Sequence, residues 1–315
     1  MTLAASDVGA QSTISANGIL KGDGSGNITA ANETEVELVS LPNICNPNLL
    51  DNWYFGNPVN QRGQTSYTGS TYGIDRWCSV SDGTVAITVT NDGIKIVRGN
   101  DGTYANFVQR LTYIPTNTTF TLSFLVDNYA SVIQIFAPGS STFNIQDNLI
   151  SLVFNARSSY PNIDEIGIQV HKGKTVTVKA AKLELGSQQT LAHQENGAWV
   201  LNEIPDYGEQ LLKCQRYLRP AALSFIVSNS NGNYYASTIM QSPYPMRTVP
   251  AIVNSDYTAQ VIREATGGQT ATVSQVFPPS VYGSFTLHLT PGGSTIPNFV
   301  YIDPTGFNPL LSAEL

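Results

Sequence analysis

Charged side chains are scarce in this chain. Asp, Glu, Lys and Arg make up 12% of the 315 residues, about half their usual share in soluble domains. The 16 Lys and Arg residues are outnumbered by 23 Asp and Glu residues, and they form no basic cluster. Proteins that bind nucleic acid normally neutralise phosphates with such a cluster. The composition therefore excludes nucleic acid as an expected partner.

Cysteines and long apolar runs are also few. The three cysteines, Cys45, Cys78 and Cys214, are odd in number and lack the spacing of metal ligands. We expect free thiols, as in a protein made in a reducing cytosol, with a Cys45–Cys78 disulfide as the open alternative. No apolar run approaches the ~20 residues that cross a bilayer, and MTLAASDVGAQS lacks the features of a secretion signal. We expect no membrane insertion.

Catalytic motifs are absent. The three histidines lie far apart, and no nucleophile elbow, phosphate loop or dinucleotide fingerprint occurs. A glycosidase needs two neighbouring carboxylates, for which Asp51 with Asp75 and Asp164 with Glu165 are candidates. The adjacent pair points to opposite faces if extended. The sequence therefore predicts no enzyme, no metal site and no cofactor.

Short β-strands dominate what is present. Hydrophobic content is 41%, too high for a disordered chain, and the abundant Gly, Ser, Thr, Asn and Tyr are typical of exposed β proteins. Strands without intervening amphipathic helices indicate an antiparallel sandwich, and we expect a jelly roll. The strands predicted in its region are Thr84–Val89, Ile94–Val97, Thr119–Val126, Ser131–Phe136, Ile150–Phe154, Ile166–Val170 and Lys174–Glu184.

One short helix is predicted before a second group of strands. Apolar residues recur at helical spacing over Tyr207–Leu218, with Asp206 placed to cap the helix and Pro220 to end it. The strands predicted after it are Leu223–Val227, Tyr234–Met240, Ala251–Asn254, Gln260–Arg263, Ala271–Val276, Gly283–Thr290 and Asn298–Ile302.

The first forty residues have few large apolar side chains. Alone they cannot bury enough surface to offset the entropy of ordering. A glycine-rich turn is predicted between short strands at Ser15–Leu20 and Asn27–Ala30. The segment is either a flexible leader or a part that becomes ordered in an assembly.

The segment from Asn48 to Trp77, NLLDNWYFGNPVNQRGQTSYTGSTYGIDRW, combines aromatic residues with Asn, Gln, Asp and Arg. Aromatic faces cover the C–H faces of a sugar, while amides, carboxylates and guanidinium groups bond its hydroxyls. The alternative is that the rings are ordinary core residues. Because the chain is acidic, a neutral sugar, or recognition by a few Arg, is favoured over a polyanionic glycan.

The same segment resembles tail-fibre and receptor-binding proteins of phages and prophages. The resemblance lies in Asn-Leu-Leu-x-Asn, Pro-Val-Asn-Gln-Arg-Gly (Pro58 to Gly63) and Tyr-Gly-Ile-Asp-Arg-Trp (Tyr72 to Trp77). ILKGDGSGNITA, from Ile19, is similar to glycine-rich shaft segments of such fibres. KLELGSQQTLAHQENGAWVL, from Lys182, and LLKCQRYL, from Leu211, resemble the end of their carbohydrate-module-like sandwich and the short helix that follows it.

The resemblance implies an all-β homotrimer. Its parts are an N-terminal shaft or attachment segment (1–41), a carbohydrate-module-like jelly-roll sandwich (42–190), a connector with a short helix (191–220) and a C-terminal β-sandwich tip (221–315). The implied location is the virion tail, assembled in the bacterial cytoplasm, with other tail or baseplate proteins as partners. Related modules hold Ca²⁺ in the sandwich, but no acidic loop here requires it.

The implied function is attachment to a bacterial surface polysaccharide through stacking and hydrogen bonding. The sandwich candidates are Trp53, Tyr54, Gln61, Arg62, Tyr72, Asp75, Arg76 and Trp77, and the tip candidates are Asn231, Asn233, Tyr234, Tyr235, Tyr244 and Arg247. A competing interpretation gives the sandwich group a structural role, with Asp75 and Arg76 as a buried pair beside Trp77. The tip is therefore the preferred contact surface.

Two other functions stay open at this point. A structural spacer or adaptor of the tail would need an apolar contact surface, which the apolar Phe307–Leu311 end favours. A polysaccharide depolymerase would need clustered acids in a cleft, and such enzymes usually have long β-helices with repeats that this sequence lacks.

Overall fold

The computed structural model describes residues 20–22, 28–30, 46–111, 114–143, 145–156, 164–221, 223–238, 245–253, 257, 261–263, 270–291, 299–302 and 309–314. The chain divides into two compact units, 1–45 and 46–315. In the first unit, β1 (Leu20–Gly22) pairs with β2 (Ile28–Ala30) in antiparallel register. The predicted glycine-rich turn between them lies outside the described residues. The rest of the predicted shaft segment lies outside the described residues.

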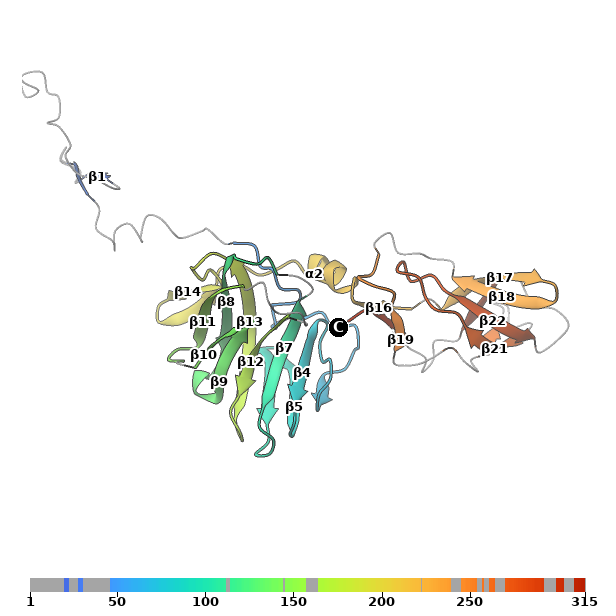
Figure 1. Cartoon of the computed structure of the whole chain (residues 1–315), viewed down its shortest axis with the longest axis horizontal. Coiled ribbons are helices and arrows are strands. Elements are labelled where there is room, and N and C mark those ends of the chain that lie inside the picture. The colour runs from blue at the N-terminus through green and yellow to red at the C-terminus, as the bar shows by residue number, and fades with distance from the viewer. Residues whose placement is uncertain are drawn as a thin grey trace, which may run out of the picture. The chain divides into compact units, whose positions relative to one another are not determined.

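Two antiparallel sheets pack face to face in the second unit (Figure 1). One contains, in spatial order, β10 (Ser140–Thr142), β9 (Val132–Ala137), β12 (Asp164–Val170), β7 (Ala105–Leu111) and β4 (Trp77–Ser81). The other contains β11 (Leu149–Asn155), β8 (Thr119–Val126), β13 (Thr175–Leu185), β6 (Gly93–Arg98), β5 (Val85–Thr90) and β3 (Ser66–Thr68). The predicted antiparallel sandwich is confirmed.

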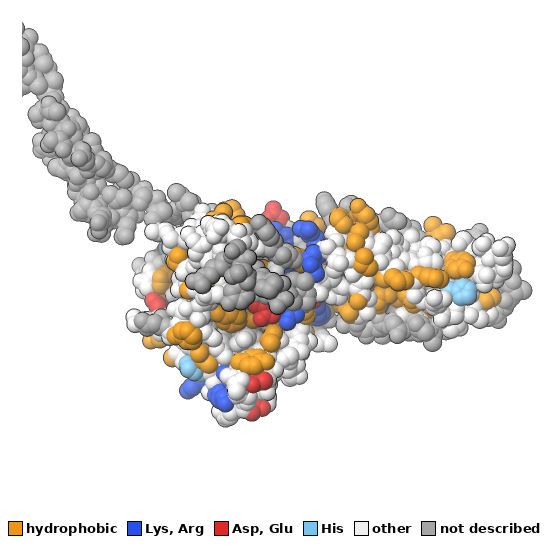
Figure 2. Space-filling view, viewed as in Figure 1, with side chains coloured by type: hydrophobic (Ala, Val, Ile, Leu, Met, Phe, Trp, Pro, Cys, Tyr) orange, Lys and Arg blue, Asp and Glu red, His pale blue; other side chains and the backbone are white. Residues whose placement is uncertain are grey.

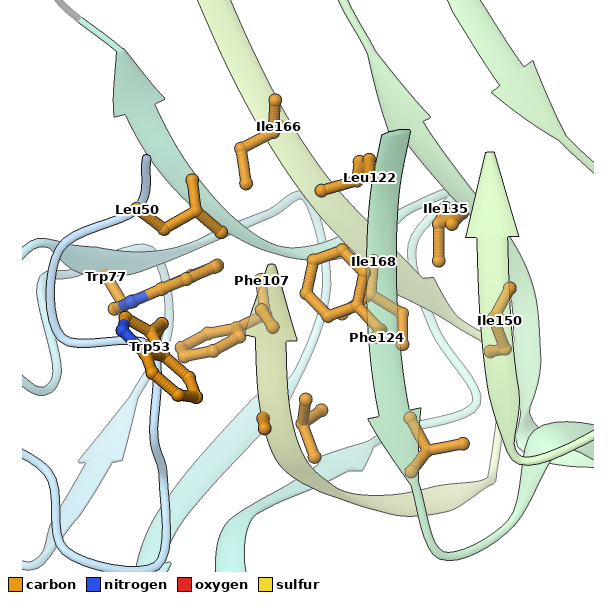
Figure 3. Close-up of a cluster of buried hydrophobic side chains, with 14 of the residues drawn as sticks. Leu50, Trp53, Trp77, Phe107, Leu122, Phe124, Ile135, Ile150, Ile166 and Ile168 are labelled. Carbon is orange, nitrogen blue, oxygen red and sulfur yellow. The ribbon is translucent and has the colours of Figure 1, made fainter. Parts of the chain in front are cut away.

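Alternation along the strands forms the sandwich core. In β11 every second residue is buried, because successive side chains of a strand point to opposite faces. The predicted hairpin at Asn91–Gly93 joins β5 to β6 in continuous register. A short 3-10 helix, Tyr129–Ser131, precedes β9. Figure 3 shows side chains of both sheets meeting between the layers, among them Leu122, Phe124, Ile135, Ile150, Ile166 and Ile168.

The predicted helix exists but is shorter than expected. It is α2, Tyr207–Cys214, and Asp206 accepts a bond from the Glu209 N–H as its cap. The helix ends four residues before the predicted Leu218, because Leu218 already belongs to β16 (Leu218–Pro220), which pairs with β24 (Leu310–Ser312). Pro220 therefore does not end it. Its buried side chains are Gln210 and Cys214, while Tyr207 is exposed.

Two small sheets flank the helix. The β14 (Ala192–Glu195) and β15 (Ala198–Leu201) strands form a hairpin. The β24 strand lies between β16 and β19 (Ala251–Val253), so the end of the chain is held between the connector and the segment that contains β19.

The C-terminal strands form a closed barrel, which corrects the predicted β-sandwich tip. Each strand is paired on both sides, since β17 pairs with both β18 and β23 and leaves no open edge. The spatial order is β17 (Ser224–Ser230), β18 (Asn233–Thr238), β22 (Thr286–Pro291), β21 (Thr270–Val276), β20 (Val261–Arg263) and β23 (Phe299–Ile302). Phe225, Tyr257 and Phe285 meet in its core.

Candidate functional site

The rings of the Asn48–Trp77 segment form part of the sandwich core. Trp53 and Trp77 are buried, and Trp77 stacks on Phe107 with centroids 5.0 Å apart. Phe55 meets the Trp77 ring edge-on at 5.1 Å. The indole N–H of Trp77 donates to the Asn52 carbonyl at 3.0 Å. Trp53 and Trp77 thus have no face available to a sugar in this structure (Figure 3).

Asn52 organises the turn that carries the polar part of this motif. Its backbone is left-handed (φ 53°), a conformation that Asn tolerates better than most residues. Its side-chain amide donates to the carbonyls of Val59 and Asp75 at 2.9 and 2.7 Å, and its side-chain oxygen accepts the Val59 N–H at 2.7 Å. These bonds tie the Pro-Val-Asn-Gln-Arg-Gly turn to the Tyr-Gly-Ile-Asp-Arg-Trp turn.

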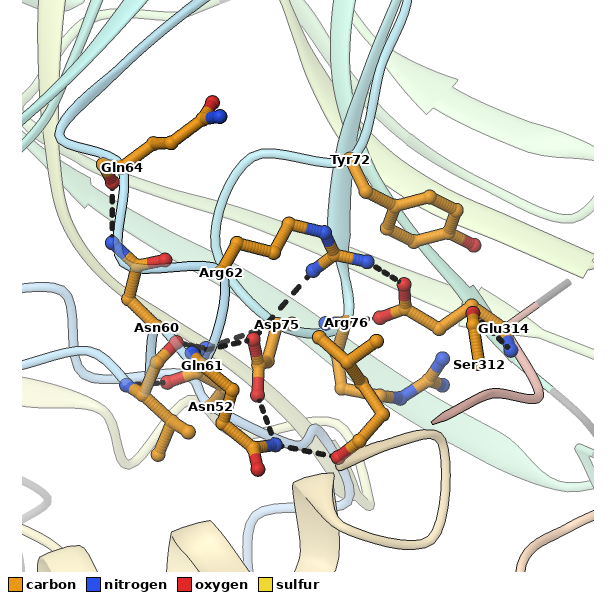
Figure 4. A network of polar contacts seen from close by, with 12 residues as sticks. Asn52, Asn60, Gln61, Arg62, Gln64, Tyr72, Asp75, Arg76, Ser312 and Glu314 are labelled. Atoms are coloured by element: carbon orange, nitrogen blue, oxygen red, sulfur yellow. Dashed lines mark hydrogen bonds and ion pairs between the residues drawn. The ribbon is translucent and has the colours of Figure 1, made fainter. Parts of the chain in front are cut away.

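Gln61 and Arg62, both partly buried, form a polar group around the buried Asp75 at that junction (Figure 4). Asp75 accepts bonds from the Gln61 backbone N–H at 3.1 Å and from its side-chain amide at 2.6 Å. Arg62 lies 3.5 Å from the same carboxylate. The Gln61 amide also donates to the Leu218 carbonyl in β16. The motif therefore holds the connector as well as its own turn.

Glu314, near the end of the chain, completes the group. Its carboxylate pairs with the Arg62 guanidinium and accepts the Arg76 backbone N–H at 3.0 Å. The Arg76 side chain pairs with Asp51 at 3.1 Å and lies 3.6 Å from the centroid of the Tyr217 ring. We call Gln61, Arg62, Asp75, Arg76 and Glu314 the docking network. Nothing in the sequence singled out Glu314, because it is 252 positions from Arg62.

Burial sets the protonation of this network. Asp75 is fully buried, and burial raises its pKa from 3.8 to about 6, although the Gln61 bonds and the Arg62 charge act in the opposite direction. Desolvation of the charged form therefore outweighs the bonds that favour it. Burial also raises the pKa of the Cys78 thiol to about 11 and that of Cys214 further. Both cysteines are free thiols, and Cys45 lies outside the described residues.

The remaining sandwich candidates are only partly exposed. Tyr54 is half-buried and packs against the core, and Tyr72 is half-buried below the Arg62 guanidinium, 5.3 Å from its ring centroid. The Asp75 and Arg76 side chains pair with Arg62 and Asp51 respectively. The competing interpretation expected Asp75 and Arg76 to pair with each other, and this is corrected: both are buried, but each pairs with a different partner. Carbohydrate binding by the sandwich residues stays a prediction.

One part of the barrel wall, formed by four of its six strands, is different because these strands carry no charged residue. The β17, β18, β21 and β22 strands contain no Asp, Glu, Lys or Arg. Tyr234 packs against the barrel core and pairs with Leu289, whereas its neighbour Tyr235 is opposite His288. Because adjacent residues of a strand face opposite sides, Tyr235 points outward. Figure 2 shows this part of the molecule as white and orange around one histidine.

Three rings gather on this wall. The Tyr235 centroid lies 5.3 Å from that of His288 and 6.3 Å from that of Phe277. His288 is held by Ser274, whose hydroxyl is 3.0 Å from its Nδ1. Beside the rings is a hollow of about 380 Å³ whose lining includes Ser237, Phe277 and Thr286. We call the rings and hydroxyls together the tyrosine patch: Tyr235, Ser237, Phe277, Thr286 and His288.

The other tip candidates are distributed differently. Asn231 and Gly232 have positive φ in the turn that joins β17 to β18, and Asn233 is exposed next to them. This turn lies at the end of the hairpin that carries Tyr235. Arg247 is half-buried away from it, with its side chain donating to the Ala313 carbonyl at 3.3 Å. Tyr244 lies outside the described residues. Sequence reasoning found Tyr235 but missed Phe277 and His288, which only barrel pairing brings to it.

The described residues show little sign of other chemistry. They contain no group of three or more His, Cys, Asp or Glu side chains that would hold a metal ion. Of the candidate acids, Asp51 pairs with Arg76, and Glu165 pairs with Arg110 at 2.9 Å. The helices among them are all too short or too polar to span a bilayer.

Several solved structures show a distant likeness to this chain. The enzymatically active domain of bacteriophage CBA120 tailspike protein 4 matches 44% of this chain at 15% identity with a TM-score of 0.27, and the match spans only 21% of that chain. The xylan-binding module CBM15 matches 40% of this chain and 100% of its own, at 15% identity and a TM-score of 0.26.

A family 11 carbohydrate-binding module of the cellulosomal cellulase Lic26A-Cel5E of Clostridium thermocellum matches 47% of this chain and 98% of its own, at 12% identity and a TM-score of 0.23. No protein-family model matches the sequence, and no curated protein matches it significantly. Likenesses this distant do not indicate a function.

Proposed function

We propose that this protein is the receptor-binding component of a phage or prophage tail fibre and attaches the virion to a bacterial surface glycan. The tyrosine patch is the observation that carries the proposal. It offers ring faces and hydroxyls on an uncharged wall, the combination that a neutral sugar requires. The ordered motifs that resemble tail fibres support the same function.

Binding at the patch is direct and non-catalytic in this proposal. The rings of Tyr235 and Phe277 cover the C–H face of a sugar, and Ser237 and Thr286 bond its hydroxyls. The hollow beside them, about 380 Å³, lies within the usual range of ligand sites. One such site binds weakly, but several on one homotrimeric fibre gain ~10²–10⁴ in avidity. Other tail or baseplate proteins hold the fibre on the virion.

The test is binding of the labelled full-length protein to a panel of bacteria and purified surface polysaccharides. Tyr235→Ala and Phe277→Ala are each expected to weaken strain-selective binding about tenfold, since each removes one ring. Phe143→Ala is the matched control, because Phe143 is an exposed ring (69%) on the sandwich. Full binding by both patch variants would place the receptor site elsewhere.

Two further readouts separate the alternatives. Release of reducing ends from a bound polysaccharide would make the protein a depolymerase. Absence of binding to every strain and polysaccharide would favour the tail spacer. The spacer hypothesis drew on the apolar C-terminal end, but Leu310 and Leu311 are buried in this chain's own small sheet. Phe307 lies outside the described residues.

A further inference from the structure

The sandwich has a second hollow, at the end where three connections meet. Its polar lining is Arg98 at the end of β6, Thr103 in the next loop, and His171, Lys172 and Lys174 in the turn between β12 and β13. Ala130 and Ile133 supply an apolar side, and the hollow measures about 480 Å³. Within the part of the chain that the structure describes, no acidic side chain lines it. We call it the rim pocket; at the lower end of the sandwich, Figure 2 shows a histidine and basic side chains with acidic side chains next to them.

Arg98 is the unusual member of this pocket. Its side chain is almost completely buried, with 2% of the residue exposed. Nη1 donates to the Val170 carbonyl at 2.6 Å, but Nε and Nη2 are buried and have no hydrogen-bond partner among the described residues. These two nitrogens form one edge of the guanidinium, the edge that binds a carboxylate with two parallel bonds. A buried charged donor without a partner is costly, so this edge is expected to have an acceptor.

The turn that carries the other cations is held in place. The Arg98 N–H donates to the Lys174 carbonyl at 3.0 Å, and the Gly173 N–H donates to that of Gly99 at 3.0 Å. Gly173 has φ 66°, and a Cβ there would lie 2.4 Å from the Asn100 side-chain oxygen. The Lys172 and Lys174 side chains are nevertheless exposed. The mouth of the pocket is therefore positively charged on a fixed backbone.

The chain as a whole is acidic, with a net charge of −7. The lining of the rim pocket differs from it, because its charged side chains are all basic. Two acids lie near the pocket and are held by other bonds: the Asp82 carboxylate accepts the Thr103 and Tyr104 N–H groups, and the Asp101 carboxylate, which Lys172 influences, accepts bonds from Thr84. Asp101 does not line the pocket. The lysines thus remain able to attract an anion toward Arg98.

We propose that the rim pocket binds the carboxylate of an acidic sugar. The carboxylate bonds the Nε and Nη2 edge of Arg98, Lys172 and Lys174 attract it, and the sugar ring lies against Ile133 and Ala130. This site is separate from the tyrosine patch and does not rest on the proposed function. A phosphate group shares the oxyanion chemistry, so the test compares the two.

The test is titration of the isotope-labelled full-length protein with glucuronate, glucose and inorganic phosphate at constant ionic strength. The Arg98 Nε–H signal, assigned with Arg98→Lys, reports on the free edge directly. We expect glucuronate to shift this signal saturably and glucose to leave it unchanged. Lys172→Gln with Lys174→Gln is expected to weaken glucuronate about tenfold. Lys95→Gln is the control, since Lys95 is exposed on the same strand outside the pocket.

Other results would overturn the proposal. An Arg98 signal that does not respond to glucuronate would mean that the free edge is satisfied by water. Phosphate binding as tightly as glucuronate would exclude the sugar carboxylate as the specific ligand. If Lys95→Gln weakened glucuronate binding as much as the two pocket substitutions, the change in overall charge would explain the loss and the pocket would not. Because the lysine variants leave Arg98 and its buried contacts intact, loss of folding does not confound the comparison.

Discussion

Single buried polar residues decide how the last residues of this chain are held. Asp75 and Arg76 are almost completely buried, and the Glu314 side chain is only 2% exposed. A buried charge costs free energy unless it is paired and hydrogen-bonded. Here each charge has partners on another segment: Arg62 for Asp75, Asp51 for Arg76, and Arg62 with the Arg76 N–H for Glu314. Because these partners are fixed, the network holds the C-terminal end in one position against the sandwich turns.

Replacing Glu314 tests this role. Glu314→Gln keeps the shape but removes the charge that faces Arg62, and breaking a buried pair from one side costs about 3 kcal/mol. We expect the free energy of unfolding in urea to fall by that amount. Glu195→Gln, an exposed acid on β14, is the control and should change little. Equal stability of the two variants would show that Glu314 does not stabilise the docked end.

Asp75 makes stability depend on pH. Its pKa is about 6 in the folded protein and 3.8 ordinarily, so between these values the folded state binds more protons than the unfolded state. Its contribution is fully present below pH 3.8 and is lost as pH rises through about 6. Relative to Asp75→Asn, which does not titrate, the wild-type free energy of unfolding should fall by up to about 3 kcal/mol across this window. A pH-independent difference in chemical denaturation would contradict this.

At the scale of elements, α2 links the connector to the sandwich. Gln210 is buried on its inner face, and its side-chain oxygen accepts the Asn52 N–H at 2.8 Å. Asn52 in turn holds both turns of the docking network. The inner face of the helix therefore makes a polar contact through Gln210 beside the buried Cys214.

Removing this contact should loosen the helix and the network together. Gln210→Ala leaves the buried Asn52 N–H without its acceptor, which costs about 1–3 kcal/mol. Leu212→Ala is the matched control, since Leu212 is exposed (54%) on the same helix. Thermal unfolding should show a lower midpoint for Gln210→Ala only. Faster amide exchange at Asn52 and Val59 would locate the change, and a midpoint equal to that of Leu212→Ala would refute it.

At the scale of the whole molecule, the first unit is the segment through which we expect chains to associate. The β1 and β2 strands are three residues each, and a two-stranded hairpin of that size is at best marginally stable alone. Residues 1–40 also have few large apolar side chains. Association of three chains along this segment, as in the proposed fibre, would supply the missing buried surface.

The oligomeric state tests that proposal. Light scattering of the full-length protein should give three times the chain mass of 33.9 kDa. A variant that begins at Asn46, the start of the second compact unit, should give a smaller mass if the first unit drives association. A monomer at all concentrations would contradict the trimer, and a trimer of the shortened variant would move the interface to the second unit.

Several secondary-structure elements were predictable from the local pattern of the sequence. Thr119–Val126 was predicted and observed with the same bounds, and the hairpin at Asn91–Gly93 was correct. Such features depend on strand alternation and turn residues within a few positions of each other. The helix end and the barrel were missed, because the β16–β24 and β17–β23 pairings join segments far apart in the sequence.

By itself, the sequence determined the class of the protein: many of its strands, though not β4 or β7, its short capped helix, its uncharged polar surface and the turns rich in Asn and Gly. These are local properties of side-chain type and spacing. Only the tertiary structure decided that Arg62 meets Glu314, that Tyr235 joins Phe277 and His288 outside the barrel, and that Arg98 keeps a buried edge free. The reason is physical: burial and long-range pairing set which polar groups meet, and neither is encoded within a short window of sequence.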